Sequence, residues 1–221
     1  MNDNKAREYW DNQYWRYVIE NNKFKNVDRS LAKDYFDCLK TVPNKIALDV
    51  GCGLGSDTKF LLEQGFAVTS TDFSETALGK MKELVPSATV LRHDTSESFP
   101  FKDETFGVII ANLSLHYFDW LTTKKVFREL YRLLAPSGIL IGRVNSNKSD
   151  WYKKPDTEVA EEIERDFFWD GQKYRRFFSK EQFTELTSTF QVEVMKEDII
   201  YRLSGNKKAI WDFVFRKEDN K

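Results

Sequence analysis

The chain has few cysteines, no long hydrophobic run and no secretory leader pattern. Its two cysteines, Cys38 and Cys52, cannot build a disulfide framework or a cysteine-based metal site. No apolar stretch approaches the ~20 residues of a membrane-spanning helix, and the first seven residues are polar and charged. We therefore expect no metal and no membrane association, with the reducing cytoplasm as the location.

A charge excess of either sign is also missing. The 34 basic residues nearly balance the 35 acidic ones, so the net charge of −1 gives no general attraction to nucleic acid. A hydrophobic content of 41% is enough to bury a sizeable core. Because no linker divides the 221 residues, we expect a single domain over residues 1–221.

Strand and helix patterns alternate through the middle of the chain. Pro136-Ser-Gly138 reads as a turn, and Ser74 as a helix N-cap. The alternation of strands and helices predicts a doubly wound α/β fold, in which helices cover both faces of a mostly parallel sheet. The predicted strands are 45–50, 66–71, 88–91, 106–112 and 139–144, and the predicted helices are 56–64, 74–84 and 121–134.

The N-terminal part reads differently. Residues 4–24 look like one or two helical pieces rich in aromatic residues, and residues 29–40 carry apolar positions at helical spacing. We therefore assign residues 1–40 to an N-terminal helical cap. Its rings, including Trp10 and Trp15, could close over a ligand as a lid or pack as an ordinary amphipathic helix.

The C-terminal part holds two further patterns. Residues 145–182 lack strand character and are rich in charge and aromatics, which suggests an insertion beside a binding site. Residues 191–201 and 208–215 alternate apolar and polar positions, and Ser204-Gly-Asn206 lies between them. This pattern predicts an antiparallel hairpin added to the parallel sheet.

A glycine turn after a predicted buried strand is the most informative motif. Residues 46–55 read Ile-Ala-Leu-Asp-Val-Gly-Cys-Gly-Leu-Gly, and a helix follows. Glycine tolerates positive φ and lets a ligand approach the backbone. In such sheets the crevice at the carboxyl ends of the strands holds ligands. A glycine turn alone would equally serve as a sharp connection without any ligand.

Carboxylates at three strand ends identify the ligand more closely. Asp72 ends the second strand, where an acid can accept hydrogen bonds from ribose hydroxyls, and Asp94 follows the third strand. Position 56 is Ser, so the dinucleotide fingerprint is incomplete. Asp49 would repel a pyrophosphate but attract the ammonium and sulfonium of S-adenosylmethionine (SAM). The residues therefore favour SAM over a nicotinamide dinucleotide.

At this point the sequence resembles the class I SAM-dependent methyltransferases. Leu48-Asp-Val-Gly-Cys-Gly-Leu-Gly55 resembles their motif I, and Thr71-Asp72-Phe-Ser74 and His93-Asp94 resemble their ribose- and adenine-binding strand ends. Residues 99–118 are similar to the fourth-strand motif, and residues 130–141 to the helix, turn and strand that follow. The resemblance covers about residues 30–145.

The resemblance implies a seven-stranded sheet in the order 3-2-1-4-5-7-6, with the seventh strand antiparallel. It implies SAM as cofactor and, by likeness to small bacterial enzymes such as the tellurite- and thiol-type methyltransferases, a small-molecule methyl acceptor. The cofactor-binding residues that we expect are Asp49, Gly51, Cys52, Gly53, Asp72, Phe73, Asp94, Thr95 and Asn112.

Residues after the fourth strand are the candidates for the acceptor side. His116 is one of only two histidines and could act as a general base, although a packing role is equally compatible with its position. Tyr117 could orient an acceptor or simply pack. The run Lys173-Tyr-Arg-Arg176 could bind an acidic acceptor, but a solvated charge run is the simpler interpretation.

Three rival functions stay open. A nicotinamide oxidoreductase is disfavoured by Asp49 and Ser56. A non-catalytic SAM-binding module would keep the donor pocket without turnover. A protein or nucleic-acid methyltransferase is the third, although the charge balance and the absence of an Asn/Asp-Pro-Pro-Tyr/Phe motif oppose an amino-methylating nucleic-acid enzyme. No oligomeric state is predicted.

Overall fold

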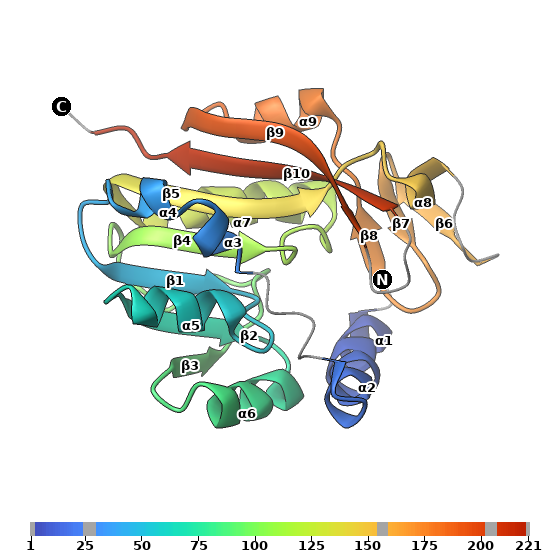
Figure 1. Cartoon of the computed structure of the whole chain (residues 1–221). Coiled ribbons are helices and arrows are strands. Elements are labelled where there is room, and N and C mark those ends of the chain that lie inside the picture. Colours follow the sequence, from blue (N-terminus) through green and yellow to red (C-terminus); the bar gives the residue numbers. More distant parts are fainter. Residues whose placement is uncertain (1–2, 24–29, 154–158, 202–206, 220–221) are drawn as a thin grey trace.

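The structure is a computed structural model that describes residues 3–23, 30–153, 159–201 and 207–219 (Figure 1). Its main sheet has the order β3-β2-β1-β4-β5-β10-β9. Strands β1 to β5 are parallel, and β10 is antiparallel to both β5 and β9. Counted within this sheet, the order is 3-2-1-4-5-7-6, as predicted. The strands are β1 (Ile46–Val50), β2 (Ala67–Asp72), β3 (Thr89–Arg92), β4 (Phe106–Asn112), β5 (Leu134–Asn145), β9 (Gln191–Tyr201) and β10 (Lys207–Arg216).

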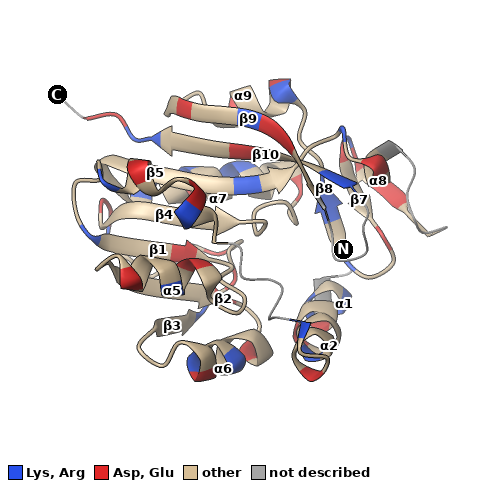
Figure 2. Ribbon diagram, viewed as in Figure 1, with Lys and Arg blue, Asp and Glu red and all other residues tan. Residues whose placement is uncertain are grey.

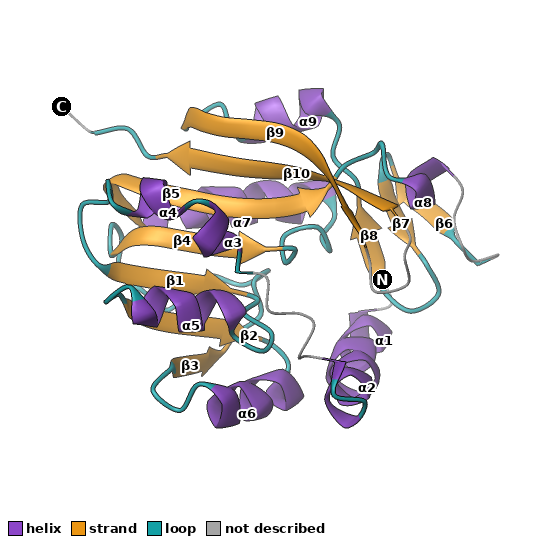
Figure 3. Cartoon of the chain, viewed as in Figure 1, coloured by secondary structure: helices purple, strands orange, loops and turns teal. Residues whose placement is uncertain are grey.

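Helices cover both faces of this sheet (Figure 3). On one face, Leu31 and Leu61 pack on Val108 and Ile110 in a buried cluster. That face carries α3 (Leu31–Asp34), α4 (Phe36–Leu39) and α5 (Ser56–Glu63), and α6 (Glu75–Leu84) packs beside α5. A second cluster on the other face joins the strands to α7 (Trp120–Leu133) and α9 (Lys180–Leu186). The doubly wound prediction is confirmed.

Local signals explain where several elements begin. The Ser74 hydroxyl accepts a hydrogen bond from Ala77 N at 3.1 Å, so the predicted N-cap of α6 is confirmed. The predicted turn at residues 136–138 falls inside the span of β5 as an irregularity, where Ser137 adopts φ 61°. The helical pattern of residues 29–40 forms two short helices rather than one, because the chain leaves helical geometry at Tyr35 (φ −117°, ψ 31°).

Residues 145–182 contain a second sheet, so the expectation that this segment lacks strands is wrong. The antiparallel strands β6 (Glu161–Glu164), β7 (Phe167–Trp169) and β8 (Tyr174–Arg176) follow the short helix α8 (Asp150–Lys153). These strands are three or four residues long, and β7 is aromatic at every position. Short strands with rings on both faces show no apolar–polar alternation, which is why the pattern was not recognised.

The N-terminal segment lies beside the main sheet near α6 (Figure 1). It consists of α1 (Asp3–Glu8), a π-helix η1 (Tyr9–Tyr14) and α2 (Trp15–Glu20). Ala6 packs against the aromatic cluster of the small sheet. The predicted turn Ser204-Gly-Asn206 lies outside the described residues, although both strands of the predicted hairpin are present. Within the described ranges, no helix has both the length and the apolar character needed to cross a bilayer.

Candidate functional site

The glycine loop after β1 is held tightly from both sides. Gly51 and Gly53 have φ values of 65° and 53°, which favour glycine. A Cβ on Gly51 would lie 2.4 Å from the Cβ of Ser114, and a Cβ on Gly53 would lie 2.7 Å from Cη2 of Trp15. Both glycines are therefore required for space as well as for backbone geometry, and the indole of Trp15 packs directly on the loop.

Asp72, at the end of β2, ties the glycine loop to the start of α6. Its carboxylate accepts hydrogen bonds from Gly53 N at 3.0 Å and from Ser74 N at 2.9 Å. The side chain is almost fully buried, and this burial raises the pKa of the Asp72 carboxyl. Asp72 thus stands where the loop, β2 and α6 meet.

The expected cavity shared by the three acids is not found: of Asp49, Asp72 and Asp94, only Asp94 is among the residues that line the cavity beside the ends of β2 and β3. Asp49 faces the helices instead. Its carboxylate turns toward α5, where it accepts a hydrogen bond from the Thr58 hydroxyl at 2.6 Å. Thr58 in turn lies 2.7 Å from the Ser70 hydroxyl. The reason is strand alternation, because Asp49 shares a sheet face with Ala47, which packs under the helices. Burial, and then the charge of Asp57, raise the pKa of Asp49.

Asp57 is a buried acid that sequence reasoning missed. Its carboxylate accepts hydrogen bonds from Ala32 N at 2.8 Å, from the Ser30 hydroxyl at 3.0 Å and from the Asn112 amide at 3.0 Å. Burial raises its pKa as well. Asp57 thereby fixes Asn112, the last residue of β4, against the first turn of α5. An acid in the first turn after the glycine loop was the available signal.

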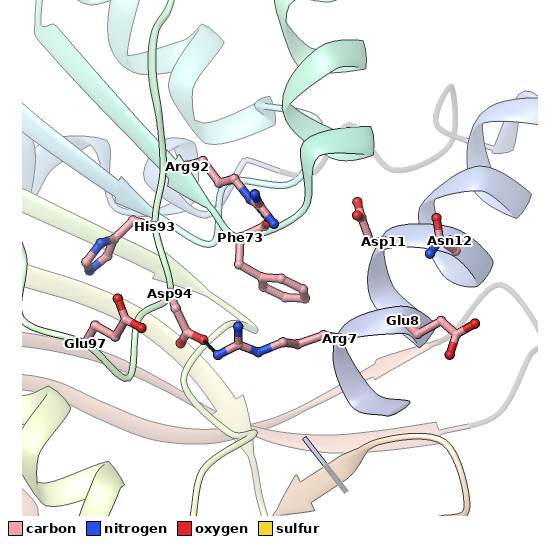
Figure 4. A pocket seen from close by; sticks show the side chains of 9 residues that line it. All are labelled: Arg7, Glu8, Asp11, Asn12, Phe73, Arg92, His93, Asp94 and Glu97. Atoms are coloured by element: carbon pink, nitrogen blue, oxygen red, sulfur yellow. Dashed lines mark hydrogen bonds and ion pairs between the residues drawn. The ribbon is translucent and has the colours of Figure 1, made fainter. Parts of the chain in front are cut away.

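A cavity of about 420 Å³ opens beside the ends of β2 and β3 (Figure 4). Asp94 lines it and forms an ion pair with Arg7 at 2.5 Å, while its other oxygen accepts a hydrogen bond from Ser96 N at 2.9 Å. The ring of Phe73 lies beside this pair, whereas Thr95 is not among the residues that line the cavity. The lining residues are Arg7, Glu8, Asp11, Asn12, Phe73, Arg92, His93, Asp94 and Glu97.

The N-terminal segment closes over this region through a stripe of residues spaced four apart, Arg7, Asp11 and Trp15. Asp11 accepts hydrogen bonds from the Ser74 hydroxyl at 2.7 Å and from Thr76 N at 3.1 Å. Arg7 pairs with Asp94, and Trp15 covers the glycine loop. These contacts place the segment over the glycine loop and the cavity; we call it the lid, and its closure over a ligand stays a prediction.

Beyond the lid, aromatic rings surround the end of β4. His116 is buried with its ring centroid 4.4 Å from that of Tyr117, and Tyr117 packs edge-to-face on Trp10 at 5.0 Å. The Lys173 ammonium lies 3.9 Å from the centre of the Tyr9 ring. Lys173 is 8% exposed and Arg176 is fully buried. The interpretation of residues 173–176 as a solvated charge run is therefore wrong.

The glycine-loop cysteine is not built as a nucleophile. Burial, and then the charges of Asp49 and Asp72, raise the pKa of the Cys52 thiol, so the reactive thiolate is disfavoured. Its sulfur lies 3.4 Å from the sulfur of Met81. In the part of the chain that the structure describes, no cluster of His, Cys, Asp and Glu could hold a metal ion.

Comparisons with known proteins agree on one family. Residues 48–142 match the family described as "Methyltransferase domain". YqeM of Bacillus subtilis (strain 168), named as a candidate methyltransferase, is 30% identical over 178 residues, which cover 68% of this chain and 69% of YqeM. The human protein named arginine-hydroxylase NDUFAF5, mitochondrial, is 28% identical over 137 residues and 61% of this chain. The chain spans 38% of that protein and 42% of its Danio rerio counterpart.

Solved structures show the same fold. A SAM-dependent methyltransferase from Methanosarcina mazei superposes with a TM-score of 0.69 at 19% identity, covering 82% of this chain and 97% of that one. The 1,6-didemethyltoxoflavin-N1-methyltransferase of Burkholderia thailandensis, with 1,6-didemethyltoxoflavin and S-adenosylhomocysteine bound, gives a TM-score of 0.59 at 20% identity. The latter match covers 79% of this chain and 71% of that one.

Replacing the buried acid beneath the loop tests the electrostatics of the site. Because the pKa of Asp49 is raised, the folded state binds more protons than the unfolded state above pH ~4, so native stability falls as the pH rises. We expect Asp49→Asn to stabilise the ligand-free protein by roughly 1–3 kcal/mol at pH 8 and by much less at pH 5. Urea unfolding at both pH values measures this, with the exposed Asp37→Asn as control. An equal effect of Asp49→Asn at both pH values would contradict the assignment.

Proposed function

We propose that this chain, which belongs to the methyltransferase family, is a SAM-dependent methyltransferase whose methyl acceptor is a small molecule. One observation carries the proposal. The end of β4 is covered by Trp10 from the N-terminal segment, which packs on Tyr117, and by the small sheet, whose Lys173 contacts Tyr9. A reaction centre enclosed by side chains from three parts of the chain suits a small acceptor better than a folded protein surface.

The donor site is proposed from the strand ends. SAM supplies a methyl group activated on a sulfonium. The cavity volume of about 420 Å³ falls within the range of small-ligand sites, roughly 300–1,000 Å³. We assign Asp72 to the ribose hydroxyls, Asp94 and Thr95 to the adenine edge, and Phe73 to the adenine ring.

The methionine end of the donor is assigned to the glycine loop. The backbone of residues 51–53 would follow the donor chain, with Cys52 contributing through its backbone rather than its thiol. Asn112 closes this end of the site from β4. The buried carboxylates of Asp49 and Asp57 lie below the loop with raised pKa values, and a cationic ligand above them would favour their ionised forms.

The protein's part in the reaction is alignment and the exclusion of water. In an in-line displacement the carbon–sulfur bond breaks as the acceptor atom bonds to the methyl carbon, and S-adenosylhomocysteine (SAH) leaves. His116 is proposed to take the proton of an O–H or N–H acceptor, and Tyr117 to orient the acceptor. Positioning alone can supply ~7–11 kcal/mol of barrier reduction in favourable cases.

Other acceptors rest on weaker support. The human relative is named an arginine-hydroxylase, which makes a protein side chain the second candidate acceptor. A nucleic-acid acceptor is opposed by the net charge of −1. In the view of Figure 2, basic and acidic residues are interspersed over α6 and β9 rather than gathered in one basic stripe. The cytoplasm stays our proposed location, although the human relative is named mitochondrial.

The decisive experiment measures SAH release with SAM and two acceptor sets. One set holds small hydroxyl, thiol, amine and ring-nitrogen compounds, and the other holds arginine- and lysine-containing peptides and proteins. We expect turnover with a member of the first set. Turnover confined to the second set would replace the proposed acceptor class, and tight SAM binding with no turnover in either set would favour a non-catalytic module.

Asp72→Ala should weaken SAH binding roughly 10- to 100-fold, because it removes a buried carboxylate that accepts charge-assisted hydrogen bonds. The variant should stay folded by circular dichroism. Calorimetry measures the dissociation constant, and Asp37→Ala, at an exposed acid of α4, is the matched control. Unchanged affinity in Asp72→Ala would remove Asp72 from the donor site.

Arg7→Ala should strengthen SAH binding, whereas Asp72→Ala weakens it. Arg7 pairs with the Asp94 carboxylate, which we assign to the adenine edge. SAH therefore has to displace Arg7 from Asp94 in order to bind. The pair is partly exposed, and we therefore expect SAH binding to tighten only about two- to five-fold at low salt and the gain to shrink in high salt. Lys5→Ala, an exposed change on the same helix, serves as control. Weaker binding in Arg7→Ala would show that Arg7 contacts the ligand rather than competing with it.

A further inference from the structure

A fully buried arginine on the small sheet connects the segment 145–182 with the residues proposed to handle the acceptor. Arg176 ends β8, and its side chain is completely shielded from solvent. Its backbone N–H donates to the carbonyl of His116 at 2.9 Å, and its Nε donates to the carbonyl of Phe118 at 2.9 Å. One residue therefore binds both carbonyls that flank Tyr117.

The remaining guanidinium contacts fix the arginine itself. Its Nη2 bonds to the carboxylate of Glu164 on β6, and its Nη1 donates to the carbonyl of Arg165 at 3.4 Å. The guanidinium carbon lies 4.9 Å from the Phe167 ring centre and 5.4 Å from that of Trp120. A planar fork that binds three groups and stacks between rings is a geometry that lysine cannot reproduce.

Glu164 extends the connection to α7. The same carboxylate oxygen that receives Arg176 accepts a hydrogen bond from Trp120 N at 2.5 Å, at the first turn of the helix. The Arg176–Glu164 pair thus contacts His116 and Phe118 in the loop between β4 and α7, and Trp120 at the start of α7. The start of this loop is already constrained, because Leu113 adopts φ 59° and its backbone N–H donates to the carbonyl of Arg143 at 2.9 Å.

These contacts have a physical reason. A loop that leaves a buried strand cannot leave its carbonyls unpaired, and neither His116 nor Phe118 lies in a helix or strand. Arg176 supplies a donor to each of these two carbonyls, and the Thr123 hydroxyl of α7 adds a longer hydrogen bond of 3.3 Å to the Phe118 carbonyl. Burial of a charged side chain is costly unless it is paired, so the Glu164 contact is what allows Arg176 to serve this loop.

We propose that Arg176, held by Glu164, is a positioning residue that sets the orientation of His116 and Tyr117 toward the acceptor. This inference rests on the proposed acceptor role of those two residues. Arg176 touches neither donor nor acceptor, and it acts through the backbone on each side of Tyr117.

The test uses the full chain labelled with ¹³C at histidine Cε1. Two histidines give two NMR signals, and His93→Gln assigns them. We expect Arg176→Lys to change the position and the pH titration of the His116 signal while leaving the His93 signal and SAH affinity unaltered. Arg175→Lys is the matched control, because Arg175 neighbours Arg176 but pairs with Asp170 and stacks on Trp151. A native His116 titration in Arg176→Lys, or an equal change in Arg175→Lys, overturns the proposal.

A second variant covers the case in which Arg176→Lys fails to fold. Glu164→Gln keeps an oxygen for Trp120 N but removes the charge that holds the guanidinium, and it should alter the His116 signal in the same direction. An unaltered signal in Glu164→Gln overturns the proposal. With an accepted substrate in hand, kcat should fall about 10- to 100-fold with little change in KM for SAM. Absence of any small-molecule turnover by the native protein would defeat the proposed acceptor class, whereas the NMR result would still decide the role of Arg176.

Discussion

The burial of several carboxylates at the strand ends is the constraint on which the site depends. Asp49, Asp57 and Asp72 are all nearly inaccessible, and hydroxyl and N–H donors hold them. Each has a pKa raised by burial, so the ligand-free site carries carboxylates in an unfavourable environment. A ligand with positive charge relieves that cost, whereas a phosphate would increase it. The buried carboxylates therefore support the proposal of a cationic donor over a ligand that carries a phosphate.

The lid and the small sheet together cover the strand ends that the main sheet leaves open. An open α/β sheet presents its strand ends to solvent, and a methyl transfer needs water excluded from them. The stripe of Arg7, Asp11 and Trp15 lies over the proposed donor side, and Trp10 and Lys173 lie on the proposed acceptor side. Trp10 and Asp11 both belong to the π-helix Tyr9–Tyr14, and π-helices, although rare overall, are common at functional sites. The N-terminal segment thus contributes to both proposed sides, and the small sheet adds Lys173 to the second.

Much of the fold could be predicted because its signals are local. The glycine loop, the Ser74 cap and the alternating β9–β10 hairpin each depend on a few adjacent residues, whereas the strand order followed from the resemblance to the class I SAM-dependent methyltransferases. The burial of Arg176 could not be predicted, because its hydrogen-bond partners lie 11 to 60 positions away. The direction of Asp49 was readable from alternation with Ala47, but the ligand argument placed it in the cavity instead. Asp57 was missed because its partners, Ser30 and Asn112, come from separate elements.

The contrast between local signals and long-range contacts also explains why family membership specifies the methyl donor but does not identify the acceptor. The family match ends at residue 142, so it includes the loop, Asp72, Asp94 and His116 but stops before the small sheet. The acceptor end adds side chains from the N-terminal segment and from β8, both outside that match. The sequence relatives themselves carry different names, one a methyltransferase and another an arginine-hydroxylase, so the family match alone does not identify the acceptor. For this chain, we therefore propose that the residues that Arg176 and the lid bring to Tyr117 distinguish one acceptor from another.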